Sequence, residues 1–255
     1  MRDANPVVHL WPGVGMFTFA KDKQTARVAA EFYINAINVM RGAEAVSEYT
    51  SLPRQEAFNI EYWLLEEAKL QRMPKPKALT GRVAIVTGRG GGIGKAIAKR
   101  FAEEGACVVL SDNNAERLDE AKAEFKKLFG RDASAGVIMD VTKGATIKDA
   151  FHEAALAFGG VDIVVNNAGI SISKTIEGHT EGDWDLLYDI LVKGQFLVTQ
   201  AGVEVIRRQG RGGDILNIVS KNALVSGPNN AGYGSAKAAQ LHLSRLNAAE
   251  LGKDR

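Results

Sequence analysis

Short apolar runs alternate with helix-length segments from about residue 78 onward, and this alternation restricts the fold more than any other feature of the sequence. The runs are four to six residues long, rich in Val and Ile and unbroken by polar residues at every second position: 82–87, 107–111, 136–139, 161–165 and 215–219. Such runs are typical of parallel strands that are covered on both faces. The helix-length segments lie at 93–104, 115–129, 145–158, within 182–209 and at 232–251. Strand and helix in this order predict an α/β fold with a doubly wound parallel sheet over residues 78–255.

Residues 1–77 have a different pattern. A stretch interrupted by Pro12, Gly13 and Gly15 precedes two helical patterns, at about 25–49 and 55–73, and each has an amphipathic face that needs a covering surface. Closely spaced prolines in the segment PKPKALTG then mark a boundary, because proline cannot continue a helix. We therefore expect a helical extension that packs on the sheet domain or on a sister subunit. It contains no residue cluster capable of chemistry.

Composition excludes several classes of protein. The single cysteine, Cys107, excludes an internal disulfide, a cysteine-rich zinc site and an iron–sulfur cluster, and the four histidines have no metal-ligand spacing. The balance of 32 basic and 30 acidic residues gives no electrostatic reason to expect nucleic acid or an anionic membrane as a partner. No apolar run approaches the roughly 20 residues that span a bilayer, and no signal peptide is recognisable. We expect a cytoplasmic protein that binds no metal.

A glycine-rich turn follows the first apolar run and opens the first helix of the sheet domain. Its residues are Thr87-Gly88-Arg89-Gly90-Gly91-Gly92-Ile93-Gly94. Glycine at 88 and 92 lets the backbone turn sharply and approach a pyrophosphate, and Gly94 lets the helix pack close to the sheet. The helix N-terminus offers unpaired N–H groups and partial positive charge to the anion. Between a strand and a helix, this turn predicts a dinucleotide site rather than a simple hairpin or linker.

Asp112 ends the second apolar run, 18 positions after Gly94. A carboxylate there can accept hydrogen bonds from the adenosine ribose hydroxyls and would repel a 2′-phosphate. The alternative is a turn residue or helix N-cap, a common position for aspartate. Arg89 could pair with a 2′-phosphate, but Asn113 brings no compensating charge next to Asp112. The sequence therefore favours NAD over NADP.

With these motifs in order, residues from about Ala78 to the C-terminus resemble a short-chain dehydrogenase/reductase. The resemblance is carried by the glycine turn, Asp112, Asp140-Val141, Asn166-Asn167-Ala168-Gly169, Ser220, Tyr233 and Lys237. It implies a Rossmann fold and NAD(P)-dependent oxidation of an alcohol or reduction of a carbonyl. It also implies that Asp140 and Val141 lie at the adenine, and that Asn167, Ala168 and Gly169 line the cofactor. Arg89 and Ile93 of the turn complete the expected cofactor-binding set.

The reaction chemistry can also be argued from three side chains. Tyr233 and Lys237 are four positions apart, so on a helix both side chains face the same way. A phenol has a pKa of about 10, and a nearby ammonium favours its anionic form, so the pair can exchange a proton with a substrate oxygen. Ser220 can hydrogen-bond that oxygen, and Lys237 can hold the nicotinamide ribose. Taken alone, the Tyr233–Lys237 pair is more typical of a solvated helix face, but together with Ser220 and the glycine turn it indicates a catalytic pair.

The sequence departs from the family pattern at two points, which limits how far the family's properties can be assigned to this chain. Leu191 stands where the family usually has an asparagine that supports a water chain to the lysine, and the sequence ends soon after the helix that bears Tyr233. We therefore expect a dehydrogenase domain truncated at its C-terminus. Residues 1–77 resemble the junction of bifunctional rhamnulose-phosphate aldolase/short-chain dehydrogenases, whose zinc-binding histidines would lie upstream.

That resemblance implies a small hydroxyaldehyde, sugar or polyol as substrate, L-lactaldehyde among them. The resemblance to short-chain dehydrogenases implies a homo-oligomer formed through the long helices within 182–209 and 232–251. The alternative function is a dinucleotide-binding or partner-docking module without turnover.

Overall fold

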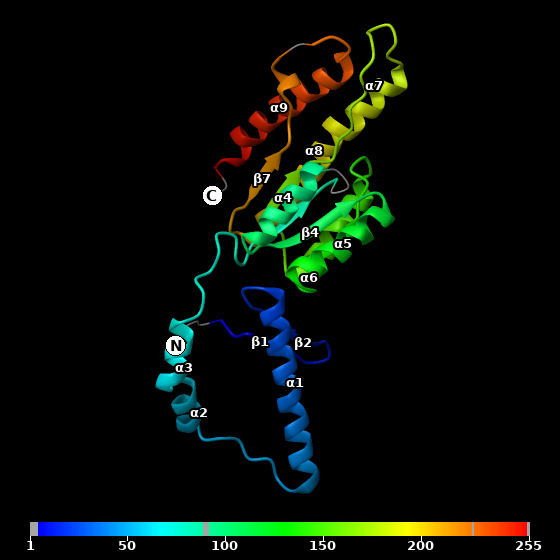
Figure 1. Cartoon of the computed structure of the whole chain (residues 1–255). Coiled ribbons are helices and arrows are strands. Elements are labelled where there is room, and N and C mark those ends of the chain that lie inside the picture. The colour runs from blue at the N-terminus through cyan, green and yellow to red at the C-terminus, as the bar shows by residue number, and fades with distance from the viewer. Residues whose placement is uncertain (1–4, 89–91, 226, 254–255) are drawn as a thin grey trace. The chain divides into compact units, whose positions relative to one another are not determined.

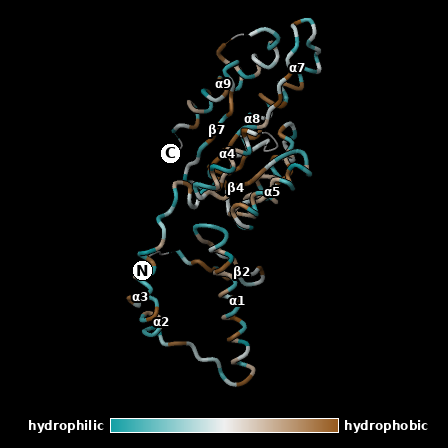
Figure 2. The backbone as a smooth tube through the Cα atoms, in the orientation of Figure 1, coloured by the Kyte–Doolittle hydropathy of each residue, from teal (hydrophilic) through white to brown (hydrophobic). Residues whose placement is uncertain are grey.

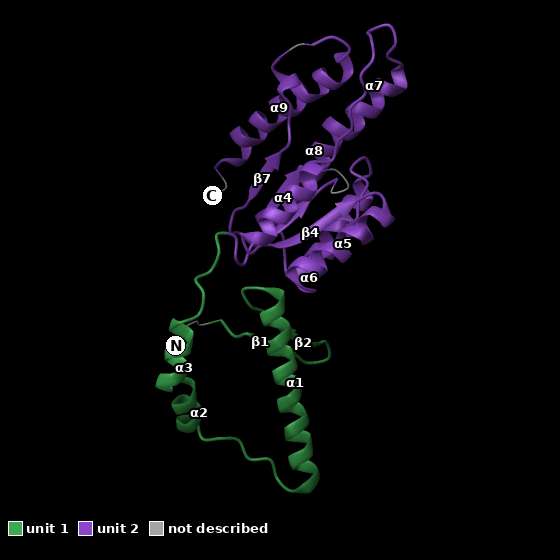
Figure 3. Ribbon diagram, viewed as in Figure 1, with its two compact units in different colours: residues 1–78 green, residues 79–255 purple. Residues whose placement is uncertain are grey.

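The computed structural model describes residues 5–88, 92–225 and 227–253 (Figure 1). The chain divides into two compact units, residues 1–78 and 79–255 (Figure 3).

Unit 1 begins with an antiparallel hairpin that the sequence interpretation did not include. Its strands are β1 (Val8–Trp11) and β2 (Gly15–Thr18), and Gly13 in the turn has a φ of 75°. Gly13 therefore lies in a turn, and Gly15 begins the second strand. Helix α1 (Lys23–Val46) follows and contacts both strands. Apolar and polar residues alternate along α1 (Figure 2).

The second helical pattern of unit 1 forms two short helices instead of one. These are α2 (Arg54–Glu61) and α3 (Leu64–Gln71). The break lies at Trp63, whose backbone is extended with φ −64° and ψ 134°. Just before it, the rings of Phe58 and Tyr62 pack with centroids 4.6 Å apart.

Unit 2 is built on a five-stranded parallel sheet, which confirms the predicted doubly wound α/β fold. The strand order is β5-β4-β3-β6-β7. The strands are β3 (Val83–Val86), β4 (Cys107–Asp112), β5 (Ser134–Ile138), β6 (Ile163–Asn166) and β7 (Asp214–Asn217). The chain crosses from β3 to β4 on one side and reaches β6 on the other. The carboxyl end of β3 is therefore the switch point at which such sheets bind ligands.

Both faces of the sheet are covered by helices, which explains why the strands lack polar alternation. Ala84 and Val86 of β3 belong to a core formed with α4 (Gly92–Glu103) and α5 (Ala115–Phe129). Val83 and Ile85 belong to the opposite core, formed with α6 (Gly144–Phe158) and α8 (Gly194–Gln209). The helices are arranged around the sheet as Figure 1 shows.

The segment after β6 contains a π-helical turn, which the sequence pattern did not indicate. Helix α7 (Glu181–Tyr188) begins with a capping box between Thr180 and Asp183, and the π-helical turn η1 (Asp189–Lys193) joins it to α8. A short 3₁₀ turn, η2 (Lys221–Ala223), follows β7 and leads to α9 (Ala231–Leu251).

Candidate functional site

The glycine turn begins where β3 ends, at the centre of the sheet. Gly88 has a φ of 65°, and a Cβ there would lie 2.5 Å from the backbone Cα of Ala168. Only glycine fits this position without displacing the backbone. Arg89, which the sequence predicts to bind the cofactor, lies outside the described residues together with Gly90 and Gly91.

Asn167, directly after β6, links the glycine turn to the neighbouring strand through hydrogen bonds. Its side-chain amide donates to the carbonyl oxygens of Thr87 at 2.9 Å and Gly88 at 3.0 Å. The Thr87 hydroxyl in turn accepts from the backbone amides of Asn167 and Ala168, each at 3.0 Å. A Cβ at Gly94 would lie 2.5 Å from the Asn167 amide nitrogen, so Gly94 leaves the space that this bridge needs. These hydrogen bonds hold together the loops that follow the carboxyl ends of β3 and β6.

A cavity of about 560 Å³ lies at the carboxyl ends of the strands and collects most of the residues predicted to bind the cofactor. The predicted residues that line it are Gly88, Gly92, Ile93, Gly94, Asp112, Asp140, Val141, Asn167, Ala168 and Gly169. Other lining residues were not singled out from the sequence, namely Asn113, Arg117, Met139, Thr142, Ile170, Leu186 and Ile190. Helix α4 opens at this cavity, and a Cβ at Gly92 would meet nothing within 4 Å.

Asp112 is held in the turn between β4 and α5. Asp112 is only 6% exposed, and its Oδ1 accepts a hydrogen bond from the backbone amide of Asn114 at 3.0 Å. Asn114 caps α5 by accepting from the amide of Arg117 at 2.9 Å. The N-cap of α5, Asn114, is thus only two residues after Asp112. Asp112 itself lines the cavity.

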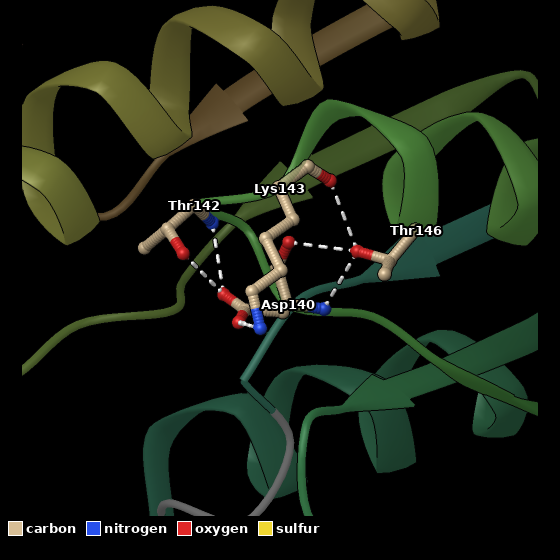
Figure 4. A network of polar contacts seen from close by, with 4 residues as sticks. All are labelled: Asp140, Thr142, Lys143 and Thr146. Carbon is tan, nitrogen blue, oxygen red and sulfur yellow. Dashed lines mark hydrogen bonds and ion pairs between the residues drawn. The ribbon is translucent and has the colours of Figure 1, made fainter.

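Asp140 lies in the loop after β5, and its carboxylate forms hydrogen bonds and an ion pair with residues of the same loop (Figure 4). Oδ1 accepts from the Thr142 amide at 3.0 Å and the Thr142 hydroxyl at 2.7 Å, and the Lys143 ammonium lies 3.1 Å from Oδ2. The Thr146 hydroxyl accepts from the Asp140 amide at 3.1 Å. Burial alone would raise the pKa of Asp140, but the hydrogen bonds from Thr142 and the nearby Lys143 outweigh it, and the pKa is lowered. The carboxylate is therefore charged and rigid.

Tyr233 and Lys237 lie on the same side of α9. The Lys237 ammonium is 5.7 Å from the centroid of the Tyr233 ring and donates to the carbonyl oxygen of Ile218 at 2.9 Å. Lys237 is 5% exposed, and burial lowers its pKa to about 8. Neither residue is among those that line the cavity, but Tyr233 packs on the same apolar cluster as Ile170, which does line it.

Ser220 lies between β7 and η2. Its Oγ accepts from the backbone amide of Asn222 at 3.2 Å, so its own hydroxyl proton can be donated elsewhere. In the described part of the chain, no hydrogen bond joins Ser220 to Tyr233. The three predicted catalytic residues are thus a pair on α9 and a separate hydroxyl on the preceding loop.

Leu191 lies in the π-helical turn η1 and is fully buried with Leu187 and Ala236. Its backbone carbonyl accepts from the Gln240 side-chain amide at 2.5 Å. A Cβ at Gly169 would lie 2.9 Å from the Leu191 side chain. Leu191 is thus an apolar packing residue beneath Gly169.

No helix in the described ranges combines the length and the apolar character needed to cross a membrane. The same residues contain no group of three or more His, Cys, Asp or Glu side chains that could hold a metal ion.

The two parts of the chain match different family models. Residues 82–255 match the model described as short chain dehydrogenase. Residues 1–70 match the model described as aldolase class II, second domain. These matches confirm the resemblance drawn from the sequence, including a dehydrogenase part joined to an aldolase part.

Similar proteins extend these matches. The uncharacterized oxidoreductase YuxG of Bacillus subtilis is 39% identical over 251 residues, which cover 98% of this chain and 36% of that protein. The chain thus spans about a third of the length of this relative. The (2S)-[(R)-hydroxy(phenyl)methyl]succinyl-CoA dehydrogenase subunit BbsD of Thauera aromatica is 38% identical over 69% of each chain.

A solved structure shows the same fold. A gluconate 5-dehydrogenase from Burkholderia cenocepacia, in complex with NADP and tartrate, is 32% identical with a TM-score of 0.64, and the match covers 68% of this chain and 67% of that one. Sequence, fold and the cavity at the switch point agree, and the chain belongs to the short-chain dehydrogenase family.

Proposed function

We propose that this protein is an oxidoreductase that interconverts the CH–OH and C=O groups of a small compound with NAD(H). The observation that carries the proposal is the Lys237 ammonium on α9, which lies 5.7 Å from the centroid of the Tyr233 ring on the same helix. A cation near a phenol favours the anionic form of the phenol, which can then exchange a proton with a substrate oxygen.

The cavity residues fit a dinucleotide. Gly92 leaves open space where α4 begins, so a pyrophosphate can approach the backbone amides there, with Gly88, Ile93 and Gly94 around it. Asp112 would accept from the adenosine ribose, which favours NAD. Further residues would hold the rest of the cofactor, namely Asp140 and Val141 at the adenine, Asn167, Ala168 and Gly169 along the cavity wall, and Arg89 in the turn. When bound, the nicotinamide ring supplies or accepts the hydride.

The proton is handled by this chain's own residues. Because the pKa of Lys237 is about 8, its ammonium form predominates at pH 7 and favours the anionic form of the adjacent phenol. Tyr233 then takes the hydroxyl proton of an alcohol, or returns it to a carbonyl oxygen. The Ser220 hydroxyl is free to donate to the same oxygen and hold it in place.

The proposed substrate is a small hydroxyaldehyde, sugar or polyol, with L-lactaldehyde as one example. The match of residues 1–70 to an aldolase domain supports it, since an aldolase reaction releases an aldehyde that a dehydrogenase in the same polypeptide could use. The similar gluconate 5-dehydrogenase also supports a polyhydroxy substrate.

Replacing Tyr233 with Phe tests the assignment. Loss of a general acid–base group should lower turnover by about a hundredfold or more. Turnover is followed by NADH absorbance with a panel of short aldehydes and polyols. The matched control is Tyr188→Phe, which removes the hydroxyl group from a ring that stacks on Trp184 on α7 with centroids 4.7 Å apart. This variant should retain turnover. Unchanged turnover in Tyr233→Phe would refute the role of Tyr233.

A second candidate is a dinucleotide-binding module without turnover. Leu191 favours it, because its buried apolar side chain offers no polar group where the resemblance places a water-holding asparagine. Dinucleotide binding without turnover across the whole substrate panel would support this candidate over the enzyme.

We also propose that unit 2 forms a homo-oligomer through α8 and α9. A groove of about 750 Å³ between α6, α8 and α9 supports this, as does Phe196 on α8, which is 48% exposed.

A further inference from the structure

Helix α9, which carries Tyr233 and Lys237, buries few apolar atoms. Among the described residues of α9, the buried ones are Gly232, Ala236, Lys237 and Gln240, and none of these has a large apolar side chain. In most helices, close packing of large apolar side chains fixes the position of the helix on its neighbours. Hydrogen bonds therefore take on part of this role in α9.

Two of these hydrogen bonds join α9 to the continuous segment formed by η1 and α8. Gln240 on α9 is 2% exposed, and its side-chain amide donates to the carbonyl oxygen of Leu191 in η1 at 2.5 Å. In return, the side-chain amide of Gln195 on α8 donates to the backbone carbonyl oxygen of Gln240 at 3.3 Å. Because η1 runs directly into α8, each glutamine binds the backbone of the other glutamine's segment.

The same contacts connect the Tyr233–Lys237 pair with the wall of the dinucleotide cavity. Gln240 lies three residues after Lys237, so the two side chains are neighbours on the helix. Leu191, whose carbonyl oxygen Gln240 binds, directly follows Ile190, which lines the cavity. The position of α9 along η1 therefore sets how far the pair lies from the cavity.

The stability of the fold does not explain why these two positions hold glutamine. Within the described parts of the chain, the buried Oε1 atoms of Gln195 and Gln240 have no hydrogen-bond partner. A buried polar atom without a partner costs free energy, and an apolar side chain of the same length would avoid this cost. Each amide uses its N–H group to hold a backbone carbonyl oxygen. The directional contact is thus what the glutamines contribute.

We propose that Gln240 is a positioning residue for proton exchange by Tyr233 and Lys237, and that Gln195 supports it. By binding the Leu191 carbonyl oxygen, Gln240 keeps α9 at a fixed position along η1. The proposal rests on the proposed function, since it assumes that the pair acts on a substrate oxygen. Displacement of a reacting group by about 1 Å can lower a rate about a hundredfold, so the restraint on α9 matters for turnover.

Gln240→Met tests the proposal, because methionine has a similar length and no N–H group. Turnover, followed by NADH absorbance with the substrate panel, should fall about tenfold or more, while the dissociation constant for NADH should change less than about twofold. The free energy of unfolding should stay near the wild-type value, because removal of the unpartnered oxygen offsets the lost hydrogen bond. The matched control Gln200→Met changes an exposed glutamine on α8 and should leave all three quantities unchanged.

A second measurement does not depend on turnover. Lys237 is 5% exposed, so acetic anhydride should acetylate it more slowly than the exposed Lys126, as followed by mass spectrometry. Gln240→Met should raise the rate at Lys237 about fivefold, the factor expected for loss of one hydrogen bond, and leave the rate at Lys126 unchanged. Gln195→Met removes the reciprocal hydrogen bond and should raise the same rate, so it provides the test if Gln240→Met folds poorly.

Wild-type turnover in Gln240→Met, or an unchanged acetylation rate at Lys237, would overturn the proposal. A fall in turnover that only follows the loss of folded protein would also overturn it, because the glutamine would then stabilise the fold as a whole. A wild type that turns over no substrate would refute the proposed function alone. Faster acetylation of Lys237 in Gln240→Met would in that case still establish that Gln240 positions Lys237.

Discussion

The Lys237 ammonium is buried, and burial disfavours its charged form, so the stability of the protein should depend on pH. Burial lowers its pKa from 10.5 to about 8 in the folded protein, while the unfolded chain keeps the ordinary value. Between these two pH values the unfolded state binds more protons than the folded state. The free energy of unfolding must therefore rise with pH across this window. Below about pH 8 the ammonium form is present in both states, and its burial is a constant cost to folding.

Lys237→Met should remove this pH dependence. From about pH 8 to 10.5 the free energy of unfolding of the wild type should rise relative to the variant, by up to about 3 kcal/mol for a shift of this size. Urea denaturation at several pH values measures the difference. Lys126→Met, which removes an exposed cation on α5, should retain the wild-type rise. Parallel curves for wild type and Lys237→Met would show that the ammonium is not desolvated.

At the scale of elements, two glycines of the same turn have different roles: Gly88 is needed for the stability of the fold, and Gly92 for dinucleotide binding. Gly88→Ala would strain a backbone with φ of 65° and drive Cβ to 2.5 Å from Ala168 Cα, so it should cost about 1–3 kcal/mol of stability. Gly92→Ala meets nothing within 4 Å and should leave stability within about 1 kcal/mol of the wild type. Its new Cβ would occupy the space of a pyrophosphate, so dinucleotide binding should weaken.

Thermal unfolding and dinucleotide titration of both variants measure these two effects. Each glycine variant serves as the control for the other, since the substitution is the same and only the surroundings differ. A Gly92→Ala variant that binds dinucleotide as tightly as the wild type would place the pyrophosphate elsewhere. A Gly88→Ala variant with wild-type stability would show that the turn can shift away from Ala168.

The sheet could be predicted because its physical signal is local. A strand covered on both faces needs an apolar residue at every position, and the run at 83–86 is fully buried as this requires. The extended break at Trp63 and the π-helical turn at Leu191 have no such signal, because neither contains a proline and their helical periodicity continues through them. The place of Arg117 on the cavity wall depends on where the Asn114 cap starts α5, and sequence distance from Asp112 does not convey it.

At the scale of the whole molecule, the groove between α6, α8 and α9 in unit 2 is the surface through which we expect the protein to form an oligomer. One side of α8 is buried against the sheet through Val198, Gly202 and Ile206, while Phe196 on another side is 48% exposed beside the groove with α9. A stable interface buries about 800 Å² on each partner, and an exposed aromatic at its centre contributes much of the binding energy. Phe196→Glu should therefore convert an oligomer to monomers, because a dimer would bury two unpaired carboxylates.

Light scattering after gel filtration measures the mass of the wild type and of this variant. The matched control is Leu128→Glu, which places the same charge on α5 at a side chain that is 51% exposed and not part of the groove. The control should keep the oligomeric mass, and both variants should keep the wild-type circular dichroism spectrum, since neither side chain belongs to the buried core. A wild type that is monomeric at micromolar concentration, or a Phe196→Glu variant that keeps the oligomeric mass, would remove α8 from the interface and leave its exposed aromatic without an explanation.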